Sequence, residues 1–271
     1  MDDLYPDYYK FVFVGIPDDI VLSELYQLGF ESFEEKGNSL EGYVPANLVN
    51  ESWKNLLGNT YTFSENHLVK QQNWNKIWES SFQPIIVEDQ VAVRATFHEP
   101  IHSPYEIIID PKMAFGTGHH ATTYLVMGAM LKLDFINKQV LDFGCGSSIL
   151  AILAEKLGAD QVAAIDYDPW SVNNSLENIE LNHCKKILVE QGDTLKSETR
   201  TFDIILANIT RDTLLNTTED IVRILNPGGV GIYSGFILQD VSILKKYLHT
   251  FGLNKIETLI REDWCALIWN K

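Results

Sequence analysis

Hydrophobic residues in the first seventy positions fall into short runs with two different spacings. Residues 8–16 are rich in aromatic and β-branched side chains, which favours a strand, and residues 17–30 repeat leucine and valine at helical spacing. The other expected elements are two strands within 30–45 around a turn at 36–38, a helix over 47–58 ended by Gly58, and a strand over 61–68. This β-α-β-β-α-β order predicts a small two-layer α+β domain of ferredoxin-like type.

From about Ala121 the pattern becomes a regular alternation of apolar strands and amphipathic helices. The expected strands cover 139–144, 161–166, 186–193, 202–209, 230–236, 254–263 and 264–269, and the expected helices cover 121–133, 147–158, 169–182, 213–225 and 240–252. A turn at 226–229 (NPGG) is expected between the helix over 213–225 and the strand over 230–236. This alternation predicts an α/β fold with a mostly parallel, doubly wound sheet, whose ligand lies beyond the carboxyl ends of the strands.

The middle of the chain separates these two patterns. An aromatic and polar stretch over 73–85 is expected to connect them as a strap or helix, and strands are expected within 85–97 and at 105–110. We therefore predict a domain over 1–66, a linker over 67–84 and a second domain over 85–271.

The composition narrows the class of partner. The chain has 271 residues and a formal net charge of −16, which argues against direct binding to nucleic acid and is compatible either with a basic partner or with solubility alone. The three cysteines show no metal-ligand or disulfide spacing, so we expect no metal. Without a signal-peptide pattern or a membrane-length apolar run, we expect a cytoplasmic protein. We expect a monomer, although no feature of the sequence determines the oligomeric state.

A glycine turn between a predicted strand and a predicted helix carries the first chemical signal. Residues 140–152 read VLDFGCGSSILAI. A dinucleotide fingerprint needs a small residue where Ile149 stands, and a phosphate loop needs a Lys-Ser/Thr pair after the glycines. The remaining pattern, Asp142-x-Gly144-x-Gly146, resembles the first motif of class I S-adenosylmethionine-dependent methyltransferases. The alternative is an ordinary strand–turn–helix corner.

Acidic residues at the ends of the next strands fit the same ligand. Asp142 can place a carboxylate near the cationic amino-acid end of the cofactor through water. Asp166 ends the second strand and can accept both ribose hydroxyls. Asp168 precedes Pro169 and is expected to be a helix N-cap. Asp193, after the third strand, is either an acceptor for the adenine amino group or a loop-capping carboxylate.

The stretches AFGTGHHATT, LDFGCGSSILAI, AIDYDP and LANI, in this order, resemble the PrmA family, the methyltransferases of ribosomal protein L11. The resemblance implies a class I methyltransferase sheet that uses S-adenosylmethionine and a protein substrate, ribosomal protein L11. It also implies that the N-terminal domain recognises this substrate, and that lysine side-chain and N-terminal amines are methylated. The cofactor contacts that it implies are Thr123, Gly144, Asp166 and Asn208, together with a loop that includes Phe115, Gly116 and Thr117.

Asn208, at the end of the fourth strand, is the predicted catalytic residue. Its neutral amide can accept a hydrogen bond from an amine and orient the nitrogen lone pair. Methyltransferases of glutamine amides have Asn-Pro-Pro-Tyr there, whereas this chain has Asn-Ile-Thr-Arg at 208–211. His119 and His120 are either a general base or, as we favour, a helix cap or a cofactor contact. A small-molecule methyltransferase and a non-catalytic binding protein are the alternative functions.

Overall fold

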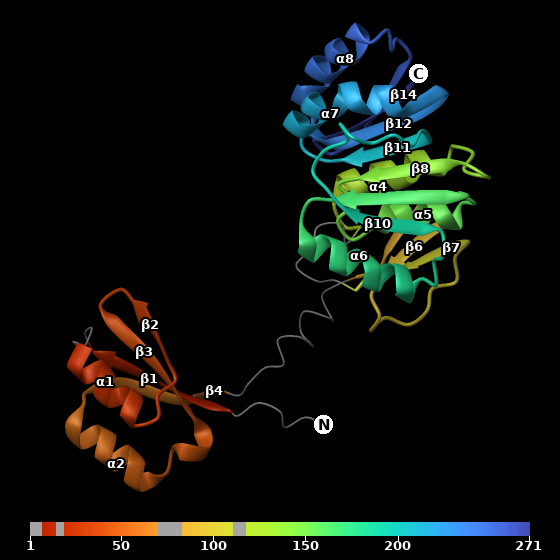
Figure 1. Ribbon diagram of the computed structural model, residues 1–271. Coiled ribbons are helices and arrows are strands. Elements are labelled where there is room, and N and C mark those ends of the chain that lie inside the picture. The colour runs from red at the N-terminus through yellow and green to blue at the C-terminus, as the bar shows by residue number, and fades with distance from the viewer. Residues whose placement is uncertain (1–6, 15–18, 70–82, 111–117) are drawn as a thin grey trace. The chain divides into compact units, whose positions relative to one another are not determined.

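The computed structural model describes residues 7–14, 19–69, 83–110 and 118–271. The chain divides into two compact units, Met1–Phe82 and Gln83–Lys271, which are treated separately below (Figure 1). The predicted strap over 73–85 lies almost entirely outside the described residues.

The N-terminal unit has the predicted β-α-β-β-α-β order. Its elements are β1 (Tyr8–Val14), α1 (Asp19–Gln27), β2 (Ser32–Lys36), β3 (Ser39–Pro45), a short 3₁₀ helix η1 (Ala46–Leu48), α2 (Glu51–Thr60) and β4 (Phe63–Val69). The sheet order β2-β3-β1-β4, with every neighbouring pair antiparallel, is that of the ferredoxin-like fold. The predicted fold of this unit is confirmed.

An aromatic core holds this unit together. Phe11 and Phe13 of β1 share a buried cluster with Leu25 of α1 and Leu57 of α2. The prediction that Gly58 ends the second helix is wrong, because α2 continues to Thr60. Gly58 does not adopt the left-handed conformation of a terminating glycine.

The C-terminal unit is built on a seven-stranded sheet in the order β10-β9-β8-β11-β12-β14-β13. Its strands are β8 (Gln139–Phe143), β9 (Gln161–Asp166), β10 (Ile187–Gln191), β11 (Phe202–Asn208), β12 (Leu225–Ile237), β13 (Ile256–Arg261) and β14 (Trp264–Asn270). The first five strands in this order are parallel, and β14 runs antiparallel to both of its neighbours. The predicted doubly wound sheet is confirmed.

Helices cover both faces of this sheet. The helices are α4 (Ala121–Met130), α5 (Ile149–Lys156), α6 (Pro169–Leu181), α7 (Arg211–Ile224) and α8 (Val241–Thr250), with a 3₁₀ turn η2 (Leu238–Asp240) before the last. Apolar residues of α4, α5 and α6 belong to one buried cluster, and those of α7 and α8 belong to a second cluster. No helix in the described ranges is long and apolar enough to span a membrane.

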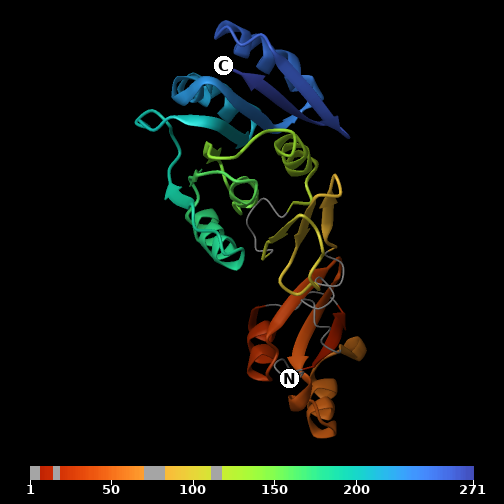
Figure 2. The same cartoon turned by 90° about the vertical axis from the view of Figure 1, so that its right-hand side faces the viewer.

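A small sheet supports the first of these helical layers. It contains β5 (Ile85–Val87), β6 (Val91–Arg94) and β7 (Tyr105–Ile108) in that order, and appears yellow beside the green helices in Figure 2. Val87, Val93 and Ile107 pack in the same cluster as α4 and α5. Strand β7 leads directly toward the stretch 111–117, which lies outside the described residues.

The NPGG turn proves to be an interruption within β12 rather than a turn before it. Leu225 pairs with Phe202, and the next pairs begin at Val230 and Ile204, so residues 226–229 bulge from the ladder. The backbone NH of Gly228 donates to the carbonyl of Lys271, which holds this bulge against the residue that follows β14.

Candidate cofactor and acceptor site

The sheet order places β8 and β11 side by side although 63 residues separate Gln139 from Phe202. The chain proceeds from β8 toward one edge of the sheet and from β11 toward the other. This reversal is a topological switch point, where doubly wound folds bind ligands beyond the carboxyl ends of the strands. The glycine turn follows β8, and Asn208 ends β11.

The glycine turn is fixed by hydrogen bonds from both of its sides. The backbone NH groups of Gly144 and Cys145 donate to the carbonyl of Ile165 at 2.8 and 3.1 Å. The NH of Gly146 donates to Oδ2 of Asp166 at 2.8 Å, and the carbonyl of Gly146 accepts from the Ser175 hydroxyl at 2.7 Å. The turn is therefore positioned by the end of β9 and by α6.

Three residues of this turn adopt left-handed backbone conformations. Gly144 has φ of +77° and Gly146 has +55°, and Ser148 has +61° although it is not glycine. A Cβ atom on Gly144 would lie 2.2 Å from Cγ2 of Ile209, so this position requires glycine on steric grounds as well. The Ser148 hydroxyl donates to Ser175 at 2.7 Å, which offsets part of the backbone strain.

Two buried carboxylates lie beside the turn. Asp142 is 1% exposed, and its Oδ2 accepts from the NH of Ala151 in the first turn of α5 at 3.1 Å. Burial, together with the nearby Asp166 carboxylate, raises the pKa of Asp142 to about 7. Asp166 uses its second oxygen to accept from the NH of Asp168 at 3.0 Å. Both of its oxygens are thus oriented by backbone donors, and each retains a lone pair for a ligand hydroxyl.

The two other acidic candidates lie nearby. Asp168 is the N-cap of α6 and accepts from the NH groups of Trp170 and Ser171, with Pro169 as the first helical residue, so this prediction is confirmed. Asp193 is exposed and lies two residues beyond β10. Whether it contacts adenine or caps its loop stays a prediction.

Asn208 presents an open acceptor at the end of β11. Its Nδ2 donates to Oγ1 of Thr123 on α4 at 3.3 Å. Its Oδ1 is buried, and it is one of five buried side-chain nitrogen or oxygen atoms in the described residues that have no hydrogen-bond partner. A buried amide oxygen in this state is costly unless a ligand supplies the donor.

The predicted loop residues Phe115, Gly116 and Thr117 lie outside the described residues, but both flanks of this stretch are described. On one side, the NH of Asp110 donates to Oδ1 of Asn178 on α6 at 3.0 Å. On the other side, Gly118 lies against α5, because a Cβ atom there would be 3.2 Å from Cδ1 of Ile149. The two flanks therefore reach the helices that border the glycine turn.

The paired histidines have separate structural roles. A ring nitrogen of His119 lies 2.8 Å from the carbonyl of Gln83. His120 is the N-cap of α4: its Nδ1 accepts from the NH of Thr122, and its ring meets Trp264 edge to face at 4.5 Å between centroids. The capping interpretation is thus correct for His120.

Known proteins with similar sequences decide the family. A family model described as ribosomal protein L11 methyltransferase (PrmA) matches residues 30–271. The chain belongs to this family. A relative named ribosomal protein L11 methyltransferase from Bacteroides fragilis is 39% identical over 96% of this chain and 98% of its own. Another from Porphyromonas gingivalis is 42% identical over 92% of this chain and 89% of its own.

A solved structure agrees with this membership. The crystal structure of a ribosomal protein L11 methylase from Lactobacillus delbrueckii subsp. bulgaricus superposes with a TM-score of 0.65 and 29% identity, covering 69% of this chain and 98% of that one. The protein is therefore a class I methyltransferase, and S-adenosylmethionine is its methyl donor.

The described residues suit this cofactor. The PrmA resemblance assigns contacts to Thr123, Gly144, Asp166 and Asn208, and all four lie at the carboxyl edge of the sheet or on the first turn of α4, which is joined to it. The carboxylate of Asp166 is oriented for hydroxyl groups, and no donor within the described part of the chain reaches the side-chain oxygen of Asn208. Which of these atoms touch the cofactor stays a prediction.

Sequence reasoning missed the residues of α6 that hold the glycine turn. Ser175 binds the carbonyl of Gly146, and Nδ2 of Asn178 donates to the carbonyl of Ser147 at 3.0 Å. The available signal was a row of asparagines at positions 174, 178 and 182, on a helix and its C-cap whose buried face is mostly polar. Polar residues at this spacing share one helix face and need partners when buried.

Proposed function

We propose that this enzyme transfers methyl groups from S-adenosylmethionine to lysine side-chain amines and the N-terminal amine of ribosomal protein L11. The observation that carries this proposal is the buried Oδ1 of Asn208, which lacks a hydrogen-bond donor among the described residues. A substrate amine has such a donor and, once unprotonated, also has a nucleophilic lone pair.

The chemistry requires a neutral amine. A lysine amine has an unperturbed pKa near 10.4, so its deprotonation at neutral pH costs about 4–5 kcal/mol. Burial of the amine lowers its pKa, because burial disfavours the charged form, and this offsets much of that cost. When bound, S-adenosylmethionine supplies an electrophilic methyl group on a positively charged sulfur. A dedicated strong base is then not required, and the released proton passes to water.

Asn208 and Thr123 orient the amine. The Thr123 oxygen accepts from Nδ2 of Asn208, which leaves Oδ1 as the atom facing the substrate. In the first transfers, an amine N–H that donates to this oxygen has its lone pair directed elsewhere, toward the methyl group. The neutral dimethylated lysine amine of the last transfer has no N–H, so its orientation depends on the shape of the site. Most of the rate enhancement would come from this positioning, which can reduce a barrier by several kcal/mol.

The glycine turn and the two carboxylates would hold the cofactor. Asp166 would accept from the ribose hydroxyls, and Asp142 would place a negative charge near the amino-acid end. Gly144 and Gly146 shape the turn, and Phe115, Gly116 and Thr117 would close over the ligand. The positions of the two flanks of that loop, against α5 and α6, support this arrangement.

The N-terminal unit would recognise the protein substrate. It has its own aromatic core, and residues 1–66 contain twelve Asp and Glu residues but only three Lys residues. An acidic unit attracts a lysine-bearing partner and increases its rate of encounter. The same acidity argues against direct nucleic-acid binding. We propose a cytoplasmic monomer. The linker predicted over 67–84 is proposed only from residue 70 onward, because residues 67–69 pair with β1 as the end of β4.

Mass spectrometry of purified L11 after incubation with the enzyme and S-adenosylmethionine tests the proposal. We expect mass gains in steps of one methyl group that end in multiples of three, because each amine can accept methyl groups until it is quaternary. Peptide mapping should place them on lysines and the N-terminus. Modification confined to glutamine, or none despite cofactor binding, would contradict the proposal.

A further inference from the structure

Helix α6 and its C-cap residue Asn182 carry three buried asparagines, four residues apart. Asn174, Asn178 and Asn182 are 4%, 0% and 9% exposed. They are linked in series: Nδ2 of Asn178 donates to Oδ1 of Asn174 at 3.2 Å, and Nδ2 of Asn182 donates to the backbone carbonyl of Asn178 at 2.8 Å. Three adjacent buried amides are unusual in a helix that packs against a sheet, so their other partners matter.

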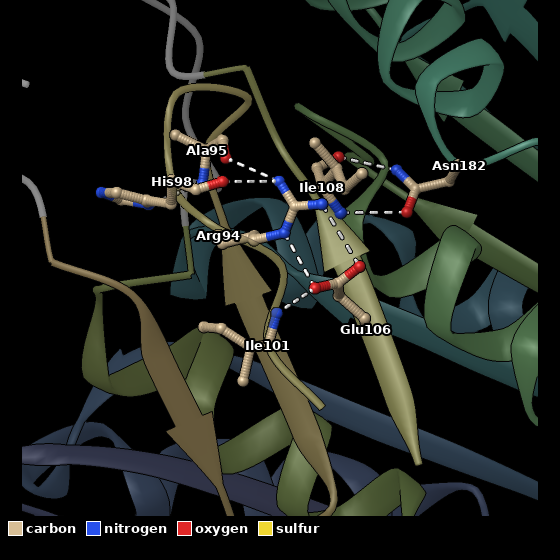
Figure 3. A network of polar contacts seen from close by, with 7 residues as sticks. All are labelled: Arg94, Ala95, His98, Ile101, Glu106, Ile108 and Asn182. Carbon is tan, nitrogen blue, oxygen red and sulfur yellow. Dashed lines mark hydrogen bonds and ion pairs between the residues drawn. The ribbon is translucent and has the colours of Figure 1, made fainter. Parts of the chain in front are cut away.

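Asn182 connects the helix to β7. Its Oδ1 accepts from the NH of Ile108 at 3.0 Å, and its Nδ2 donates to the carbonyl of the same residue at 2.6 Å (Figure 3). Strand β7 is itself fixed to β6, because the buried Arg94 forms an ion pair with Glu106 at 2.8 Å. Asn182 therefore attaches α6 to a rigid part of the small sheet.

Asn178 connects two different segments of the site. Its Oδ1 accepts from the NH of Asp110, two residues after β7 ends, and its Nδ2 donates to the carbonyl of Ser147 in the glycine turn, each at 3.0 Å. With the bond to Asn174, both hydrogens of Nδ2 are used. One fully buried amide thus joins the glycine turn to the segment that leads toward residues 111–117.

We infer that Asn178 is a positioning residue for cofactor binding, which sets the glycine turn in register with the exit of β7. The inference rests on the proposed cofactor site. Ser147 is adjacent to Gly146, whose NH orients Asp166, so a displaced turn would also misplace that carboxylate. Asn182 lacks any contact with the turn among the contacts of the described residues, and its role is confined to attaching β7.

The matched pair Asn178→Leu and Asn182→Leu separates positioning from stability. Both variants lose a buried amide and keep a similar side-chain volume, so both should lower the melting temperature. Titration calorimetry with adenosylhomocysteine, run at equal distances below each melting temperature, should show a Kd raised about tenfold or more for Asn178→Leu, the scale of misplaced supporting contacts. The Kd of Asn182→Leu should stay within about threefold of wild type.

Hydrogen exchange provides a readout that needs no ligand. In the free protein, amides of residues 144–148 should exchange faster in Asn178→Leu but not in Asn182→Leu. Equal Kd values and equal exchange in the two variants would overturn the inference. The same holds if Asn178→Leu and the milder Asn178→Ala both unfold while the Asn182 variants fold, because Asn178 would then serve global stability. A wild-type protein that does not bind adenosylhomocysteine would refute the proposed function instead.

Discussion

The glycine turn and the end of β11 lie at the same edge of the sheet, but their polar groups differ in whether they have hydrogen-bond partners. At the turn, NH and carbonyl groups of Gly146 are both bound, by Asp166 and Ser175. At the end of β11, the amide oxygen of Asn208 is buried and has no donor among the residues that the structure describes. The polar groups of the glycine turn are hydrogen-bonded within the protein, so the turn is formed before a ligand binds. The amide oxygen of Asn208 instead remains available for a donor from the substrate.

The largest effect should follow from removal of the open acceptor. Asn208→Ala should lower kcat with L11 by about a hundredfold or more, since loss of one hydrogen-bonding group aimed at the reacting atoms has effects of that size. Steady-state kinetics at saturating cofactor measures it. Thr210→Ala is the control, because Thr210 is an exposed neighbour whose hydroxyl contacts Thr213, and it should retain most activity. A kcat near wild type for Asn208→Ala would remove Asn208 from the mechanism.

The next effect concerns the charge of the Asp142 carboxylate and its influence on cofactor affinity. Because burial raises the pKa of Asp142 to about 7, its carboxylate is largely neutral at pH 6 and ionised at pH 8. If the ionised form attracts the cationic cofactor, calorimetry should show affinity about tenfold weaker at pH 6 than at pH 8. Asp142→Asn should bind weakly at both pH values. A wild-type affinity that does not change over this range would contradict the role.

The same carboxylate has the opposite effect on the stability of the free protein. A raised pKa means that the folded state binds a proton more tightly than the unfolded state between about pH 4 and 7, so this group's contribution to stability falls as pH rises through that window. The Asp142→Asn variant has no carboxylate to ionise at this position, so it does not lose stability in this way as pH rises. Its unfolding free energy should exceed that of wild type at pH 8 by up to ~4 kcal/mol and match it near pH 4, as measured by denaturant titration. An advantage that does not vary with pH would have another cause.

A smaller effect should follow from freeing the Asn208 amide to rotate. Thr123→Val removes the acceptor for Nδ2 while it preserves side-chain shape, so kcat should fall about tenfold. Thr123→Ser restores the hydroxyl and should recover most of the rate. If Val and Ser behave alike, Thr123 does not orient Asn208.

The sequence predicted the architecture because its periodic patterns are strong. The order of elements in both units was anticipated, as were the cap at Asp168 and the ferredoxin-like sheet. The failures were local. Gly58 does not end α2, and NPGG bulges inside β12, because tertiary pairing with the C-terminal Lys271 overrides turn propensity there.

The candidate site was predictable only for residues that belong to motifs. Gly144, Asp166 and Asn208 stand at strand ends, where the topology alone brings them together. The supporting residues Ser175 and Asn178 are distant in sequence from the turn, and their role depends on how α6 packs. A pattern of spacing shows that they share a buried face but cannot show which carbonyl groups that face meets.

The smallest effect tests the backbone strain at Ser148 in the glycine turn. Ser148 occupies a left-handed conformation and donates to Ser175. Ser148→Ala keeps the strain and loses the hydrogen bond, so it should destabilise the protein by about 1 kcal/mol. Ser148→Gly loses the same bond but relieves strain of about 1 kcal/mol, so its melting temperature should stay near that of wild type. Calorimetry should therefore show a drop of about 2–4 °C for Ala only. Equal decreases in the melting temperatures of both variants would mean that the left-handed backbone at Ser148 carries no measurable strain. The hydrogen bond of the hydroxyl would then be the only contribution of Ser148 to stability that this test detects.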